Sequence, residues 1–325
     1  MNIDGGINIV LQIQEFRIEM LGTLIDNLLY FVSSPLIYLY LPFFIIAGMF
    51  WCMNKRAATC IAMSFLVTKL LADLIKYVLA IPRPWMMNQL VIPSEKAIEG
   101  APGFSCPSGH TAVTASFWGL LAIIFRKTFI LPLLCLIPII IIPFSRIYLG
   151  VHTPLDIILG LLTAALGIGL SLKVTTWLEK NPKMDWIIAL SGYIFILLSV
   201  IFLIWRYLLS PEWAETRIAA ATITSIIGCG YYAGFITGWL IERHWINYEI
   251  NGGIVQRLII FSIGSITLLG LLYYLKRLLS LVLTTEIAGF CANFSITLFI
   301  FAVYPWILQW MKTRVSKYST KKKYS

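Results

Sequence analysis

Long apolar stretches recur along the whole chain, and short polar connections separate them. Each stretch approaches the roughly 20 residues that an α-helix needs to cross the hydrocarbon core of a bilayer. The stretches lack the alternation of apolar and polar positions, over ~10 residues, that is typical of membrane β-barrel strands. The pattern therefore predicts an all-α integral membrane protein with about nine transmembrane helices, near residues 32–53, 57–81, 110–126, 128–144, 154–177, 186–207, 218–241, 258–275 and 285–310.

The first 27 residues follow a different pattern. Ile9, Ile13 and Phe16 recur at helical spacing on one face, which continues to Leu24, whereas Glu15 lies elsewhere. A helix of this kind is typical of a segment that lies in the membrane interface, and a poorly ordered start fits the pattern as well. The segment has neither the basic head nor the short apolar core of a cleaved signal peptide.

Composition supports the membrane assignment. The chain is 59% hydrophobic and 12% charged, with a mean hydropathy of +0.85, whereas soluble domains carry roughly 25% charged residues. Six cysteines are scattered without a CxxC pair, so the sequence indicates neither a zinc site nor a disulfide framework.

The net charge of +10 does not indicate a nucleic-acid partner, because much of the excess lies in short connections and in the tail. The positive-inside rule predicts that these segments are cytoplasmic. The loops at 82–109 and 145–153 are then predicted to face the opposite side of the membrane. The basic positions in question are Lys55, Arg56, Arg126, Lys127, Lys180, Lys183 and the tail from Lys312 to Lys323.

Charged and imidazole side chains gather on that opposite side. In K-Y-V-L-A-I-P-R-P-W, two helical turns separate Lys76 from Arg83, so the two cations point in roughly the same direction. In S-R-I-Y-L-G-V-H-T-P-L-D, Asp156 can reach His152 across one turn if Pro154 lies in the first turn of the following helix.

These residue types are suited to a phosphate ester. The step S-G-H at residues 108–110 opens an apolar helix, and a helix N-terminus offers free N–H groups to an anion. Arginine grips phosphate oxygens through paired donors, and lysine adds a point charge. One histidine can attack phosphorus while an aspartate orients it, and a second histidine can protonate the departing oxygen.

Three motifs carry a resemblance to a known family. Lys76-x6-Arg83-Pro84, then P-S-G-H at 107–110, then Ser145-Arg146-x5-His152-x3-Asp156 together resemble the signature of the type 2 phosphatidic acid phosphatase (PAP2) superfamily. Soluble haloperoxidases share this signature, but the hydrophobicity of the chain favours the membrane-bound branch. The motifs cover residues 70–160.

The resemblance implies a PAP2-type helical core with additional C-terminal helices. It implies four parts: an interfacial segment (1–27), a catalytic membrane core (28–177), additional transmembrane helices (178–311) and a basic cytoplasmic tail (312–325). It also implies a role for each site residue and requires no metal or other cofactor. The implied roles are nucleophile for His152, its orienting partner for Asp156, general acid for His110, and phosphate binding for Lys76, Arg83, Ser108, Gly109 and Arg146.

The implied activity is hydrolysis of a lipid phosphate monoester or diphosphate through a phosphohistidine, on the extracytoplasmic face. Phosphatidic acid, phosphatidylglycerol phosphate, polyprenyl diphosphate, sphingoid-base phosphate and lipid A phosphate all fit a substrate that stays in the bilayer. The membrane is then a bacterial inner membrane or the endoplasmic reticulum, with the site facing the periplasm or lumen.

Two alternatives remain open. The number of spans and S-P-E-W at 210–213 resemble the glucose-6-phosphatase branch, but Asp156 departs from that branch. The ending K-K-Y-S fits a dilysine signal for retrieval to the endoplasmic reticulum, although the positive-inside rule predicts a basic tail for any cytoplasmic end. A transporter or an inactive scaffold is the non-enzymatic alternative, and the complete set of motif residues argues against it.

Four further polar residues lie in or near these segments. Lys69 and Asp73 share a helix face with Lys76, which predicts an ion pair that positions the Lys76 side chain. His244 lies beside a predicted cytoplasmic loop and is interpreted as structural. Cys106 is interpreted as a spacer next to the P-S-G-H motif.

Overall fold

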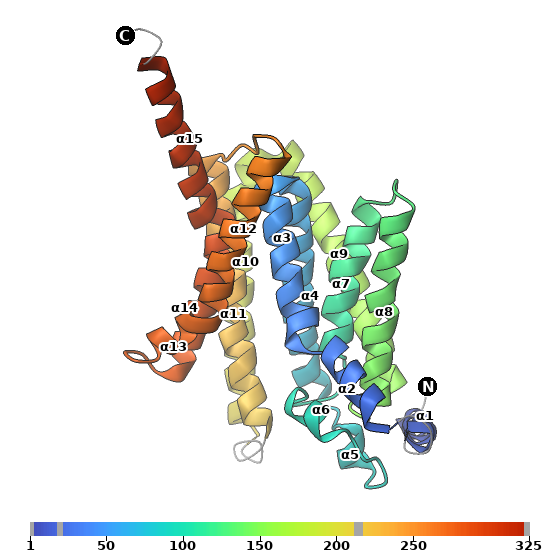
Figure 1. The fold of residues 1–325 in the computed structure, drawn as a ribbon. Helices are drawn as coiled ribbons and strands as arrows, with labels where there is room; N and C mark the ends of the chain where they lie inside the picture. Colours follow the sequence, from blue (N-terminus) through green and yellow to red (C-terminus); the bar gives the residue numbers. More distant parts are fainter. Residues whose placement is uncertain (1–2, 18–21, 211–216, 322–325) are drawn as a thin grey trace. The chain divides into compact units, whose positions relative to one another are not determined.

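The computed structural model describes residues 3–17, 22–210 and 217–321, and no strand occurs among them (Figure 1). Eight segments of the described chain are long and apolar enough to cross a membrane. A ninth apolar helix, Gly109–Ile124, is shorter than these at 16 residues. These nine segments correspond to the nine predicted spans, and the predicted all-α membrane fold class is confirmed. The eight segments of the described chain that are long and apolar enough to cross a membrane are Leu24–Cys52, Lys55–Met87, Ile130–Tyr148, Pro154–Lys180, Pro182–Leu208, Arg217–Ile246, Ile254–Leu279 and Thr285–Arg314.

Short π-helical turns interrupt several of these spans without ending them, as happens where one residue is inserted into a helix. The α-helices are α1 (Ile3–Phe16), α2 (Gly22–Val32), α3 (Leu41–Cys52), α4 (Lys55–Leu79), α5 (Pro84–Met87), α6 (Glu95–Glu99), α7 (Gly109–Ile124), α8 (Ile130–Tyr148), α9 (Pro154–Lys180), α10 (Asp185–Leu208), α11 (Arg217–Ile241), α12 (Ile254–Gly270), α13 (Lys276–Leu279), α14 (Thr285–Leu298) and α15 (Tyr304–Lys321). The π-helical segments are η2 (Leu36–Tyr40), η5 (Glu242–Ile246), η6 (Leu271–Leu275) and η7 (Phe299–Val303), and η3 (Pro182–Met184) is a 3₁₀ turn.

The chain forms two compact units, and the long helices α3, α4, α9, α10 and α11 contribute to both. All residues of the predicted site fall in the first unit. The first unit consists of Met1–Phe43, Cys60–Trp177 and Ser199–Ser225, and the second of Phe44–Thr59, Leu178–Leu198 and Ile226–Ser325.

In the first unit, α1 lies against the loop that carries α5 and α6 (Figure 1). Ile7 and Val10 pack on Val91 of this loop. The buried amide of Gln14 donates to the carbonyl oxygen of Leu90 (2.9 Å) and accepts from the backbone N–H of Ile92 (2.6 Å). Because both polar atoms of this buried amide are satisfied, α1 is fixed in register on the loop.

The predicted interfacial face of this segment is divided, because Ile13 packs against the cluster that contains Ala97 and Ala101 of the loop. Phe16 is 50% exposed and Leu24 is 79% exposed, as required of side chains that face lipid. The structure divides the segment into α1 and α2, and residues 18–21 lie outside the described part. The S-P-E-W stretch beyond residue 210 and the terminal K-K-Y-S also lie outside it.

In the second unit, glycines bring α11 and α14 into close contact. A Cβ added at Gly230 would lie 2.3 Å from the carbonyl oxygen of Phe290, and one added at Gly234 would lie 2.1 Å from that of Phe294. Glycine at every fourth position lets two membrane helices approach this closely. The sequence analysis overlooked this spacing, which continues to Gly238.

His244 belongs to the second unit. Its Nε2 lies 3.3 Å from Oδ2 of the buried Asp185, and its ring stacks on that of Trp186 with centroids 5.2 Å apart. These contacts fit the structural role predicted for His244.

Candidate active site

Arg83 lies between two prolines at the end of α4. Pro82 and Pro84 disfavour continuation of the helix, and Arg83 takes an extended conformation (φ −71°, ψ 154°) just before α5. Its buried guanidinium donates to three backbone carbonyls at 3.0 Å each, and so it joins the loop before α7 to the loop before α9. The three carbonyls belong to Pro102, Gly103 and Val151.

Lys76 lies in the last turn of α4 and faces the same loop. Its Nζ donates to the carbonyl oxygens of Phe104 (3.0 Å) and Ser105 (3.3 Å). The two cations therefore converge on residues 102–105, as predicted. Helical spacing is not the cause, because α4 ends at Leu79 and Arg83 is extended.

The turn that presents His152 is built on a glycine. Gly150 has a φ of +73°, and a Cβ there would lie 3.1 Å from Cα of Pro93. This left-handed residue ends α8 and turns the chain back. The N–H groups of Val151 and His152 then both donate to the carbonyl oxygen of Arg146, at 3.1 and 3.2 Å. The sequence spacing between Arg146 and His152 is thus set by the turn at the C-terminus of α8, which returns His152 to the carbonyl group of Arg146.

The carboxylate of Asp156 both stabilises the N-terminus of α9 and contacts His152. Pro154 is the first residue of α9, as the sequence analysis supposed. Oδ2 of Asp156 accepts from the backbone N–H of Thr153 (2.7 Å), and Oγ1 of Thr153 accepts from that of Asp156 (3.4 Å), which is a capping box. The same carboxylate oxygen lies 3.3 Å from Nδ1 of His152.

The tautomer of His152 follows from its neighbours. Nη1 of Arg83 lies 3.0 Å from Nε2 of His152, and a guanidinium can only donate, so Nε2 must be the acceptor nitrogen. The ring proton then lies on Nδ1, toward Asp156. Burial, followed by the charge of Arg83, lowers the pKa of His152 well below its ordinary value of 6.5, although Asp156 opposes the shift. The imidazole is therefore neutral at pH 7.

His110 is the second residue of α7, whose N-cap is Ser108. The Oγ of Ser108 accepts from the backbone N–H (3.4 Å) and the hydroxyl (3.0 Å) of Thr111. The predicted phosphate-binding role of Ser108 thus competes with its role as the N-cap of α7. The ring of Tyr38, from η2, lies against His110 with centroids 4.0 Å apart.

Arg146 is buried and only partly satisfied. Its Nη1 donates to Oγ of Ser33 at 3.2 Å, whereas Nε and Nη2 have no hydrogen-bond partner in the described part of the chain. Unpaired donors on a buried cation are costly unless an anion meets them.

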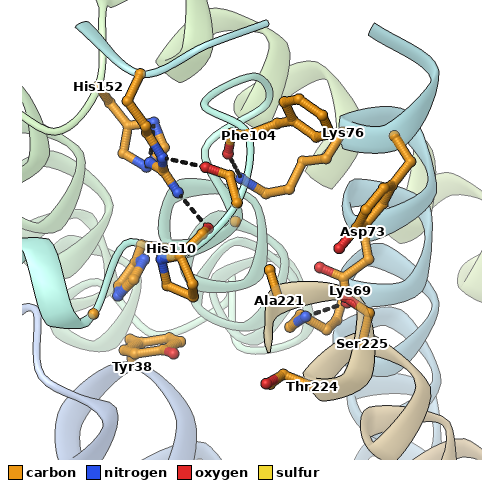
Figure 2. A pocket seen from close by; sticks show the side chains of 16 residues that line it. Tyr38, Lys69, Asp73, Lys76, Phe104, His110, His152, Ala221, Thr224 and Ser225 are labelled. Carbon is orange, nitrogen blue, oxygen red and sulfur yellow. Dashed lines mark hydrogen bonds and ion pairs between the residues drawn. The ribbon is translucent and has the colours of Figure 1, made fainter. Parts of the chain in front are cut away.

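A cavity of about 150 Å³ lies among these elements (Figure 2). Among the predicted site residues, Ser108, Arg146 and Asp156 are not part of its lining. No cluster of three or more potential metal-ligating side chains occurs among the described residues. The predicted residues that do line the cavity are Lys76, Arg83, Gly109, His110 and His152.

Comparison with known families agrees with this arrangement. Residues 57–180 match the model described as the PAP2 superfamily, and residues 226–317 match that of the PAP2 superfamily phosphatase, transmembrane extension. The chain therefore contains a PAP2 superfamily domain and the transmembrane extension found with it. Its second matched segment covers most of the additional C-terminal helices, so these helices also occur in other PAP2 proteins.

Two curated relatives were found. The chain is 30% identical to lipid phosphate phosphatase delta of Arabidopsis thaliana over 192 residues, which are 56% of this chain and 43% of the plant protein. It is 26% identical to undecaprenyl-diphosphatase of Sulfolobus acidocaldarius over 162 residues, 49% of this chain and 75% of that protein. The chain thus spans less than half the length of the first relative. No solved structure matches it significantly.

Sequence analysis of this PAP2 chain missed Ser105, although it directly precedes Cys106 and the P-S-G-H motif. Its buried hydroxyl donates to Oδ2 of Asp156 at 2.5 Å and lies 3.4 Å from Nδ1 of His152. Burial, with Asp156 nearby, raises the pKa of the Cys106 thiol to about 12, which fits a spacer rather than a nucleophile.

Residues outside the 57–180 match also reach the site. Tyr38, Ala221, Thr224 and Ser225 line the cavity, and Ser33 holds Arg146. They lie far from the motifs in sequence, so their spacing gave no signal. Lys69 and Asp73 form the predicted ion pair and also line the cavity.

Proposed function

We propose that this PAP2 chain is a membrane phosphatase that hydrolyses a lipid phosphate through a phosphohistidine, without a metal ion. The observation that carries the proposal is the position of His152, which is held between Arg83 and Asp156 at the wall of a cavity that Lys76 and His110 also line. The names of the two relatives support phosphorylated lipids as substrates.

In the first step, Nε2 of His152 attacks phosphorus and the bond from phosphorus to the ester oxygen breaks. The electron pair passes to the ester oxygen, which takes a proton from His110. The negative charge of the bound phosphate favours the imidazolium form of His110 that this step needs. His152 becomes a phosphorylated imidazolium that keeps its Nδ1 proton, and the carboxylate of Asp156 stabilises this positive charge.

In the second step, a water molecule attacks the phosphohistidine. His110 accepts a proton from the water, the P–N bond breaks, and inorganic phosphate leaves. The neutral tautomer of His152 is then restored. Each histidine returns to its starting protonation state, so one cycle consumes one ester and one water.

Cationic side chains replace the metal ion in this mechanism. Lys76 and Arg83 reach the cavity, and Arg146 carries two unpaired donors. Fixed positive charges in a site shielded from water stabilise the charge that develops on the phosphoryl oxygens. The backbone at Gly109 opens α7 toward the same oxygens.

The positive-inside rule supports an extracytoplasmic site. Arg126 and Lys127 connect α7 to α8, at the ends of these helices that are remote from His110 and Arg146. We therefore place the cavity on the periplasmic or luminal side, where a lipid anchored in that leaflet can present its phosphate.

Phosphate release by the purified protein tests the proposal. Wild-type protein should hydrolyse dodecyl phosphate or dodecyl diphosphate in EDTA, and an acid-labile, base-stable ³²P label should be trapped on it. His152→Ala should lack both turnover and label, because the variant loses the imidazole nitrogen that attacks phosphorus. A labelled His152→Ala protein, or activity that requires Mg²⁺, would refute the mechanism. The matched control is His244→Ala, which should retain activity.

A further inference from the structure

The cavity has a second polar region beside the phosphate-binding residues. Lys69 and Asp73, from α4, line it together with Thr224 and Ser225, from α11. Figure 2 shows this group on the side of the cavity away from His152, with Tyr38 and His110 along one edge. Because these four residues line the same cavity as His110, a leaving group held there can contact them.

The first turns of α11 are fixed against residues 98–103, in the loop between α6 and α7. Gly103 has a φ of +66°, and a Cβ there would lie 2.8 Å from Cβ of Ala221. Nη1 of Arg217 donates to the carbonyl oxygen of Ile98 at 3.2 Å. The same loop supplies the Gly103 carbonyl that accepts from Arg83, so the position of α11 is coupled to that of the phosphate site.

The charges of this second region largely cancel. Asp73 is only 6% exposed, and its carboxylate forms an ion pair with Lys69. A second phosphoryl group placed here would meet a carboxylate and a lysine that is already paired. An uncharged alkyl group would meet a carboxylate and two hydroxyls, and it would desolvate them without replacing their hydrogen bonds.

We propose that Asp73, Thr224 and Ser225 select phosphate monoesters whose leaving group carries a hydroxyl or amino group near the ester oxygen. This inference rests on the proposed phosphatase function. A hydroxyl or an amine can donate to the Asp73 carboxylate and to the hydroxyl oxygen of Thr224, whose own proton is directed to the carbonyl oxygen of Ala220 (2.8 Å). Ser225 lines the same region, and a diphosphate is disfavoured. The region lies partly in residues 181–225, which neither matched family segment covers.

Four probes of equal chain length test the selectivity: dodecyl phosphate, 2-hydroxydodecyl phosphate, 2-aminododecyl phosphate and dodecyl diphosphate. For the full-length wild type in mixed micelles, kcat/KM for the hydroxy or amino probe should exceed that for dodecyl phosphate by about 10-fold or more, as expected for a charge-assisted hydrogen bond. The diphosphate should be the poorest substrate. The hydroxy and amino probes show which group the region prefers.

Variants separate selection from simple ion pairing. Asp73→Asn should abolish the preference, and Lys69→Met combined with Asp73→Asn should not restore it. Thr224→Val together with Ser225→Ala should weaken the preference, whereas Ile223→Val, an exposed position on the same helix, should preserve it. If Asp73 only neutralises Lys69, Asp73→Asn will slow all four probes alike and the double variant will recover.

The outcomes distinguish this inference from the proposed function. Hydrolysis of all four probes within about 3-fold of one another, or fastest hydrolysis of the diphosphate, would overturn the selectivity and leave the phosphatase proposal intact. Failure to release phosphate from any probe would overturn both.

Discussion

Replacing Asp156 by asparagine tests how the nucleophile is activated. The amide oxygen of the variant can still accept from Thr153 and Ser105, so the cap of α9 is retained. The negative charge is lost, however. At the Nδ1–Oδ2 distance of 3.3 Å, an effective dielectric constant of about 20 gives roughly 5 kcal/mol of attraction for the imidazolium formed on phosphorylation. Losing it should lower kcat by about 10³- to 10⁴-fold.

The amide of the Asp156→Asn variant can also change the tautomer of His152. If its NH₂ group faces His152, it donates to Nδ1 and leaves the proton on Nε2, the atom that must attack. An aspartate-to-asparagine change in the serine-protease triad acts in this way and costs about 10⁴-fold. Rapid-quench measurement of ³²P-phosphoenzyme formation isolates the first step, and it should slow by the same factor as turnover.

Two controls sharpen this experiment. Ser105→Ala keeps the charge and removes one donor, so it should cost about 10- to 100-fold. Asp156→Ala should also lower the melting temperature, because it removes the capping box, worth about 1 kcal/mol. An Asp156→Asn protein that forms phosphoenzyme within about 10-fold of the wild-type rate would show that the carboxylate does not stabilise the imidazolium.

Three further predictions follow from the geometry. The pKa of His152 is lower in the folded protein than in the unfolded chain, so the free energy of unfolding should decrease as the pH falls below 6.5. Between pH 6.5 and 5 the decrease should approach about 2 kcal/mol relative to His152→Asn, measured by denaturant titration in detergent. Equal pH profiles for the two proteins would contradict this prediction. Gly150→Ala should lower the free energy of unfolding by about 1–3 kcal/mol and reduce kcat, because the new side chain strains a left-handed residue and presses on Pro93. Gly169→Ala should not destabilise the protein, because a Cβ there meets no atom within 4 Å. Similar melting temperatures for the two variants would refute this prediction. A cysteine at Glu95 should react with an impermeant maleimide in sealed vesicles of known orientation from the extracytoplasmic face only, and one at Lys180 only after permeabilisation; the reverse pattern would place the site in the cytoplasm.

Local patterns predicted the parts of the structure that depend on nearby residues. The length of each apolar stretch gave the helices, because a bilayer fixes that length. Pro154 at the first position of α9 gave the contact between His152 and Asp156, because a capping box has fixed spacing. The convergence of Lys76 and Arg83 on one loop was also predicted, but from a two-turn helical spacing that the structure does not contain, because α4 ends at Leu79.

Long-range contacts left no such signal. Tyr38 meets His110 across about 70 residues of sequence, and no periodicity connects η2 with α7. Hydrophobicity also cannot tell a side chain that faces lipid from one that faces protein. The apolar pattern of the first segment therefore predicted the exposed position of Phe16, but it did not predict that Ile7 and Val10 are buried against Val91. The close approach of α11 and α14 was readable from the glycine spacing, but only if small residues are counted as contacts.

The contacts of Ser33 and Tyr38 bear on how this chain could be recombined with others. Both residues precede the segment that defines the family match, yet one bonds Arg146 and the other covers His110. A chimera joined at residue 57 would transplant every motif residue but separate two of them from their supports. The functional module is thus larger than the inherited signature, and graft boundaries belong before α1, whose Gln14 anchors the loop below Arg83.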